Sequence, residues 1–193
     1  MSDGAALLET VAGGSIVAVR SFLRSGGLVD RRSVNLAARL GRTDMLQAFR
    51  ELHGTERFFS QACENAALAG RLQTLVFLFR HDCPLSAWTF AAAVRGSDTT
   101  ARAQIAQFLV SARCPFDHRT CEAAAGIGDF ELLRLLVDNG HPLTATCVSN
   151  AAITGNIEIM KFLIARGCPW DARARVYLDH YMRGDFICRG QAM

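Results

Sequence analysis

Small, apolar and polar positions recur in blocks of similar length along this chain. The pattern Ala-Ala-x-x-Gly occurs five times, beginning at Ala37, Ala66, Ala92, Ala124 and Ala151. After most of these glycines, apolar residues follow at spacings of three and four, as in Leu75 and Leu78. Such spacing predicts amphipathic helices. Self-similarity at a period of about 20–50 residues is typical of stacked repeat proteins.

Each block predicts a short helix, a tight turn at Gly and a second helix running back. Gly accepts the left-handed backbone that ends a helix, and paired Ala allow the first helices of neighbouring units to approach closely. Where the second helix ends, proline prevents its continuation in four units. We expect the apolar residue after each proline to pack beneath the neighbouring unit. These residues are Leu85, Phe116, Leu143 and Trp170.

The predicted fold is therefore all-α, a solenoid of about six stacked helix-turn-helix units in one array over residues 1–193. Helices this short are marginal alone, so stacking must supply most of the stability. We expect little or no regular strand. The predicted units span about 5–30, 31–57, 58–85, 86–116, 117–143 and 144–170, and a partial unit caps the array over 171–193.

This pattern resembles the ankyrin repeat, which has an Ala-Ala-x-x-Gly turn between antiparallel helices. Glu131 and Glu158 match the family's Gly-x-x-Glu continuation. Cys-Pro-Phe-Asp at 114–117 and Cys-Pro-Trp-Asp at 168–171 are similar to a divergent, shortened type found in giant DNA viruses and some protists. The family's Thr-Pro-Leu-His stretch is absent, and the glycine period is mostly below the usual 33 or so residues, which implies shortened hairpin loops.

The interval from Gly96 to Gly128 is the longest and holds about five extra residues around 97–101. They predict a longer loop or an additional turn at the start of the second helix. Insertions in repeat arrays fall in loops and sometimes at binding faces. A tolerated surface loop is the favoured interpretation, since lengthening a loop costs little entropy.

The resemblance implies a non-enzymatic adaptor or scaffold whose protein partner contacts the first-helix face and the loops between units. The two residues before each turn Gly are often exposed in that family, and several here are apolar. A contiguous exposed apolar strip suggests an interface, although the same side chains could lie flat against the next turn. Trp88 is compatible with core packing or exposure. The candidate binding residues are Leu68, Val94, Arg95, Ile127 and Ile153, together with His118 and Arg119 from the loops.

Composition narrows the functional classes and cellular compartments that fit this chain. The net charge is +3, but the basic residues are spread along the chain, so the concentrated basic stripe of a nucleic-acid binder is missing. The seven cysteines occupy equivalent places in the repeat, which favours buried thiols in a reducing compartment over a disulfide framework. His141 replaces one of these cysteines, which indicates a structural position. Without a signal peptide or a long apolar run, we expect a cytoplasmic protein, in the host cytoplasm or nucleus if it is viral.

No motif carries chemistry. The chain has no glycine-rich phosphate-binding loop and no Gly-x-Ser-x-Gly nucleophile elbow. It also lacks the Cys-x-x-Cys and His-Glu-x-x-His motifs that bind zinc. We therefore expect no enzymatic activity, no metal and no cofactor. The leading hypothesis is a monomer that binds an intracellular protein, possibly a host protein if the viral resemblance holds. The alternative is a self-associating structural protein. Nucleic-acid binding and catalysis are less favoured.

Overall fold

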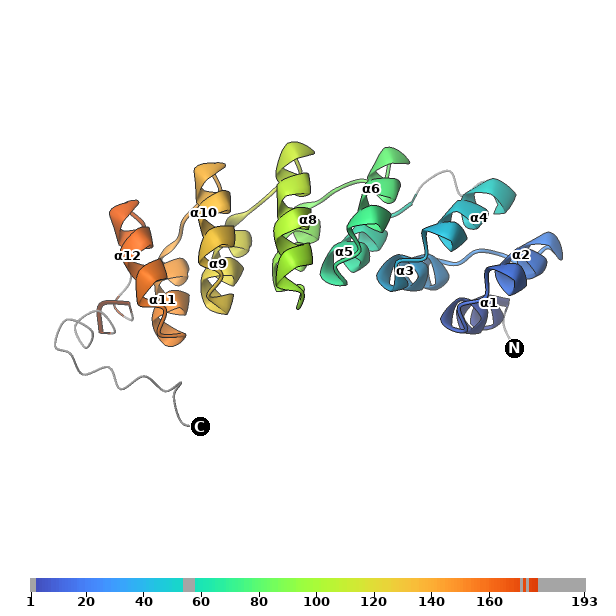
Figure 1. The fold of residues 1–193 in the computed structure, drawn as a ribbon, viewed down its shortest axis with the longest axis horizontal. Coiled ribbons are helices and arrows are strands. Elements are labelled where there is room, and N and C mark those ends of the chain that lie inside the picture. Colours follow the sequence, from blue (N-terminus) through green and yellow to red (C-terminus); the bar gives the residue numbers. More distant parts are fainter. Residues whose placement is uncertain (1–2, 54–57, 171, 173, 177–193) are drawn as a thin grey trace, which may run out of the picture. The chain divides into compact units, whose positions relative to one another are not determined.

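The computed structural model describes residues 3–53, 58–170, 172 and 174–176. Within these residues every regular element is an α-helix and no strand occurs (Figure 1), which confirms the all-α prediction. The chain divides into two compact units, unit 1 with residues 1–115 and unit 2 with residues 116–193. A single array over 1–193 stays a prediction. The predicted cap at 171–193 lies outside the described residues, apart from 172 and 174–176.

The helices come in pairs, and one pair falls in each of the six predicted repeats, apart from the first two residues of α1. We call the first helix of a pair inner and the second outer. The inner helices are α1 (Asp3–Ala12), α3 (Arg31–Leu40), α5 (Ser60–Leu68), α7 (Ala87–Arg95), α9 (His118–Ile127) and α11 (Ala145–Ile153). The outer helices are α2 (Ile16–Arg24), α4 (Thr43–His53), α6 (Leu72–Arg80), α8 (Thr99–Ser111), α10 (Phe130–Asp138) and α12 (Ile157–Ala165).

In unit 1 the pairs follow one another in chain order (Figure 1). Each of the inner helices α1, α3, α5 and α7 packs on the next, and so does each of the outer helices α2, α4, α6 and α8. In unit 2, α9 packs on α11, and the rings of Phe130 and Phe162 join α10 to α12 with centroids 5.3 Å apart. Neighbouring pairs therefore share one interior within each unit.

The predicted apolar stripes form this interior. Leu75, Leu133 and Leu163 of the outer helices are fully buried, and burial of each such side chain contributes about 1.5–3 kcal/mol. The two alanines of the repeat are also buried in α3, α5, α9 and α11. Because most of these helices have only nine or ten residues, contacts between pairs, and not intrinsic helicity, hold them in place.

Side-chain caps and left-handed turns set the limits of the helices. The Asp30 carboxylate accepts a hydrogen bond of 2.8 Å from the Ser33 amide and begins α3. At the other end Gly41 adopts φ 77°, a conformation that a side chain disfavours. Asp129 and Asn156 cap α10 and α12 in the same way. Short polar residues therefore mark these helix starts, whereas α5 and α6 begin after Phe59 and Arg71 without a side-chain cap.

The extra residues after Gly96 form an additional helical turn. Helix α8 has 13 residues, whereas α6, α10 and α12 have nine each. Asp98 caps α8 by accepting a hydrogen bond of 3.0 Å from the Ala101 amide. Of the two predicted outcomes, the longer outer helix is confirmed.

The apolar residues after the prolines are only partly covered. Phe116 is 43% exposed, and its ring stacks on His141 of the following repeat. Trp170 is 54% exposed. The residue that enters the interior is the one before the proline: Cys83, Cys114, His141 and Cys168 are all buried. Their amides bond back to a carbonyl near the end of the preceding outer helix, as in the 3.0 Å bond from Cys83 N to Leu78 O. This is the Schellman arrangement, which turns the residue toward the helix it follows.

Candidate functional site

In the five inner helices from α3 onward, the residue that precedes the helix and caps it sets a common register. Counted from that residue, the third, fourth, seventh and eighth positions are buried in α3, α5, α7, α9 and α11. With 3.6 residues per turn, the second, fifth, sixth and ninth positions lie on the opposite face. We call this the outward face. The capping residues are Asp30, Phe59, Ser86, Asp117 and Thr144.

This register corrects the sequence alignment at α7 by one residue. Val94 is fully buried and takes the eighth position, which alanine holds in the other inner helices. Gly96 precedes the turn position and has φ −57° and ψ 143°, unlike Gly41. A Cβ at Gly96 would lie 3.2 Å from the carbonyl oxygen of Leu68, which is a tight contact, so close packing favours glycine here. Val94 is therefore a core residue, and its prediction as a binding residue is wrong.

The other candidates of unit 1 lie on the outward face. Leu68 is 46% exposed at the ninth position of α5, and Arg95 is exposed at the same position of α7. Trp88, at the second position of α7, is 55% exposed, which decides the alternative that the sequence left open. Helices α5 and α7 pack side by side. They therefore present an aromatic, an aliphatic and a cationic side chain on one face.

In unit 2 the candidates lie at both ends of the inner helices. Ile127 and Ile153 are 46% and 64% exposed near the carboxyl ends of α9 and α11, which pack together. His118 and Arg119 are exposed in the first turn of α9. The carboxylate of Asp117 accepts a hydrogen bond from the Arg119 amide and lies 3.6 Å from its guanidinium. Arg119 is thus tied to the start of its own helix.

The sequence analysis missed an arginine-lined groove on α3 and α5. The groove measures about 450 Å³, and its lining includes Arg31, Arg32 and Arg39 of α3 and the amides Gln61 and Asn65 of α5. All three arginines are exposed. Arg32 and Arg39 hold the second and ninth positions after the cap, so counting from Asp30 would have placed them on one face. The sequence analysis noted only that the basic residues are spread along the chain.

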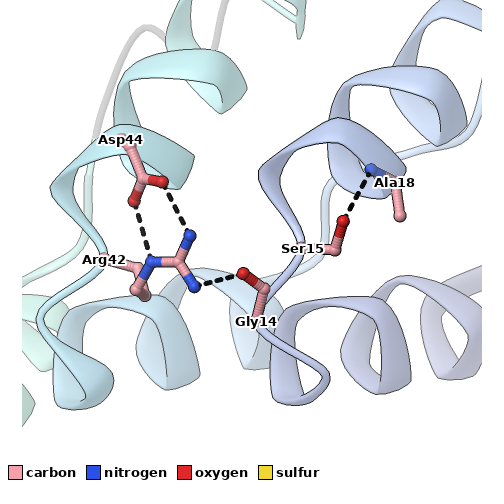
Figure 2. Close-up of polar contacts among 5 residues, drawn as sticks. All are labelled: Gly14, Ser15, Ala18, Arg42 and Asp44. Carbon is pink, nitrogen blue, oxygen red and sulfur yellow. Dashed lines mark hydrogen bonds and ion pairs between the residues drawn. The ribbon is translucent and has the colours of Figure 1, made fainter.

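A polar contact joins consecutive turns in unit 1 (Figure 2). Arg42 follows the turn Gly41, and its guanidinium donates a hydrogen bond to the carbonyl oxygen of Gly14 in the preceding turn. Asp44 holds the guanidinium through bonds of 3.0 and 2.7 Å, and the bond from Arg42 lowers the pKa of the Asp44 carboxyl. Asn156 donates in the same way to Gly128 O in unit 2, at 3.3 Å. We call these contacts turn clamps. Their role is structural, because they join the turns of successive repeats.

The cysteines that precede proline also have a structural role. The thiols of Cys83, Cys114 and Cys168 donate to the carbonyl oxygen of the residue that caps the inner helix of their own repeat, at 3.2–3.4 Å. The six described cysteines are all buried and free, as predicted for thiols in the core. Burial raises the pKa of Cys114 and of Cys121 to about 12, so both are protonated at neutral pH and are poor nucleophiles.

His141 occupies the same position in the fifth repeat. The side chain is buried, and its ring stacks on Phe116 with centroids 3.8 Å apart. Burial lowers the pKa of His141 to about 4 because the charged imidazolium loses its hydration. The residue is therefore neutral at physiological pH.

Within the described part of the chain, no group of three or more His, Cys, Asp or Glu side chains is arranged to hold a metal ion. Over the same residues, no helix combines the length and apolar character needed to cross a membrane. A scan of the chain against protein-family models finds no match, and a search of curated proteins also finds none. The resemblance to ankyrin repeats therefore depends on the residues of this chain alone.

Proposed function

We propose that this chain is a non-enzymatic protein-interaction module built from ankyrin-type repeats. The observation that carries the proposal is a set of exposed apolar side chains on the inner helices, each of which is buried along its opposite face. These side chains are Leu68, Trp88, Ile127 and Ile153, which are 46–64% exposed. A large aromatic side chain beside arginine is the composition that dominates the energy of protein interfaces. The partner is a protein.

The repeat architecture supports this proposal. Helix pairs that share one interior need a regular buried face, whereas their outward positions are free to vary. In this chain those positions differ from one inner helix to the next: Arg32 in α3, Gln61 in α5, Trp88 in α7 and Arg119 in α9. Variation on a constant scaffold is what selection for a particular partner would produce. A host protein in the cytoplasm or nucleus remains the candidate partner if the viral resemblance holds.

The test is to replace Leu68, Ile127 and Ile153 together with Lys and to measure partner capture from the native cell. We expect capture to be lost with unchanged thermal unfolding, since all three side chains are exposed and surface substitutions usually change stability by less than about 0.5 kcal/mol. The matched control is Val17→Lys on α2, a side chain that is 75% exposed on an outer helix. Capture that survives the triple substitution contradicts the proposal.

Light scattering distinguishes self-association from binding to a different protein. A partner-binding module remains monomeric as its concentration rises, whereas a structural protein that assembles through the same face grows in mass. If the triple substitution abolishes such growth, the outward face is an interface between copies of the chain and the adaptor proposal fails.

A further inference from the structure

The groove on α3 and α5 has an unbalanced charge. Three guanidinium groups line it, and none of the described residues in its lining is acidic. The nearest carboxylates along the chain are already used: Asp30 caps α3 through the Ser33 amide, and Glu64 accepts a hydrogen bond of 3.2 Å from Ser86 on the α7 side. Like charges that share a groove repel one another, so an anionic occupant is favoured.

The arginines are available for a partner. Among the described residues, no ion pair joins Arg31, Arg32 or Arg39 to a carboxylate. Arg31 is held in place, because its guanidinium lies 4.2 Å from the centroid of the Phe59 ring. Guanidinium groups bind carboxylates through two parallel hydrogen bonds. The groove therefore combines free donors with one arginine that is already positioned.

A second hollow adjoins the groove and extends the argument to an apolar side chain. It measures about 600 Å³, shares Arg31 and Gln61 with the groove, and is also lined by Phe59 and Pro84. Phe59 is 48% exposed. An occupant that fills both therefore has negative charge on one side and an apolar group next to it.

This combination favours a peptide over a nucleic acid. Asp82 lines the adjoining hollow and would repel a phosphate backbone that continued into it. Nucleic-acid binding also calls for basic residues along an extended surface, whereas these arginines are confined to one helix. The side-chain amides of Gln61 and Asn65 can both donate to and accept from a peptide backbone.

We propose that the groove between α3 and α5 binds an acidic segment of a partner protein, with carboxylates on Arg32 and Arg39 and an adjacent apolar side chain on Phe59. This inference rests on the proposed function and specifies the chemistry of the partner. It differs from that function in using α3, and not the exposed apolar residues of α5 and α7.

The test begins by panning the whole chain against a phage library of random short peptides. We expect the selected peptides to be enriched in Asp and Glu next to an apolar residue. The selected peptide, labelled with fluorescein, is then titrated by fluorescence anisotropy. A version with Asn and Gln in place of Asp and Glu should bind at least about tenfold more weakly, and binding should weaken as salt is raised.

The decisive variant is Arg32→Gln with Arg39→Gln, for which we expect Kd to rise at least about fivefold, the sum of two exposed charge pairs. The matched control is Arg24→Gln with Arg80→Gln, which removes the same charge from exposed positions at the ends of α2 and α6 and should leave Kd unchanged. Circular dichroism verifies the fold of both variants. Equal weakening by the two variants, or selected peptides without acidic enrichment, overturns the inference.

Two further results distinguish its failure from that of the proposed function. If a single-stranded oligonucleotide binds with the same dependence on Arg32 and Arg39 and acidic peptides do not, the groove is a nucleic-acid site and the inference is wrong. If partner capture depends on Leu68, Ile127 and Ile153 but not on these arginines, the protein-binding function stands and only the acidic-segment inference fails.

Discussion

At the scale of single residues, His141 shows how one position of the repeat accepts different side chains. Cysteine and histidine both lie buried before a proline, at the end of an outer helix. The two differ in how they respond to acid, because a thiol stays neutral where an imidazole gains a proton. The repeated cysteines made burial of this position predictable, and the histidine follows the same rule.

We predict that acid destabilises unit 2 through His141. Its pKa is lowered from 6.5 to about 4 in the folded chain, so the unfolded chain binds the proton more readily. The contribution of the neutral ring to stability is complete above about pH 6.5 and is lost as the pH falls toward 4. The loss is up to about 3 kcal/mol, measurable by urea unfolding at a series of pH values.

The control for this prediction is His141→Cys, which installs the residue found in the other repeats. Because the carboxylates of the chain also titrate in acid, the informative quantity is the difference between the two proteins. The free energy of unfolding of the original chain, minus that of the variant, should fall as the pH decreases across this window. A constant difference would show that His141 does not cause the acid sensitivity.

At the scale of elements, the residue two places after α2, α6, α8, α10 and α12 adopts a left-handed backbone. Glycine holds this position at Gly26, Gly140 and Gly167, but Asp82 has φ 59° and Arg113 has φ 51°. A side chain in this conformation costs about 1–2 kcal/mol. Helices α6 and α8 therefore end with strained residues, and aspartate tolerates this conformation better than arginine does.

We predict that Arg113→Gly stabilises the chain by about 0.5–1 kcal/mol, because relief of strain exceeds the added entropy of the unfolded chain. The converse change, Gly140→Ala, should cost about 1 kcal/mol. A Cβ at Gly140 meets no atom within 4 Å, so only backbone strain opposes it. Thermal unfolding checks both, since 1 kcal/mol shifts Tm by about 2–4 °C at this chain length. A Tm that falls on Arg113→Gly would contradict the argument.

A second prediction tests the corrected register of α7. Val94→Ala should destabilise the chain by about 1–2 kcal/mol, because it removes two buried methyl groups and leaves a cavity. Leu68→Ala removes a larger side chain from an exposed place and should cost less than about 0.5 kcal/mol. Chemical denaturation gives both values. If Leu68→Ala cost more stability than Val94→Ala, the register of α7 inferred from Gly96 would be the correct one.

This shift explains what the sequence could and could not predict. The glycines predicted that helix pairs exist and where they turn, since a left-handed turn restricts the residue type. They could not fix the register of α7, because Gly96 has φ −57° and lies close to the α5 backbone, so it does not mark a left-handed turn. Ser86, which caps α7, carries the correct register. The arginine groove was missed because it becomes visible only when faces are counted from the caps.

At the scale of the whole molecule, stability comes from contacts between neighbouring pairs, as expected for repeats. The turn clamps belong to this class of contact, because the donor and the acceptor come from successive repeats. The sequence predicted stacking from the short helices. It did not predict the clamps, since the residue after the turn glycine is arginine in one repeat and asparagine in another.

We predict that Arg42→Ala lowers the free energy of unfolding by about 1.5–3 kcal/mol, the range for a hydrogen bond to a charged group. Hydrogen exchange should accelerate first at the amides around Gly14, whose carbonyl loses its donor. The control is Arg20→Ala, which removes an exposed ion pair with Glu51 and should change stability by less than about 1 kcal/mol. If hydrogen exchange accelerated equally at amides along the whole chain, the stabilising effect of the clamp would not be local to the turn at Gly14.

The clamp has a consequence for how such a chain can change over time. Its acceptor is a main-chain oxygen, which every amino acid supplies, so the junction between two repeats carries no pairwise code. Duplication, loss or reordering of clamped repeats therefore still allows the contact to form, provided that a side-chain donor such as Arg42 or Asn156 follows the turn. Differences between repeats are then needed only at solvent-exposed positions. Substitutions there can change the choice of partner while the contacts between repeats stay the same.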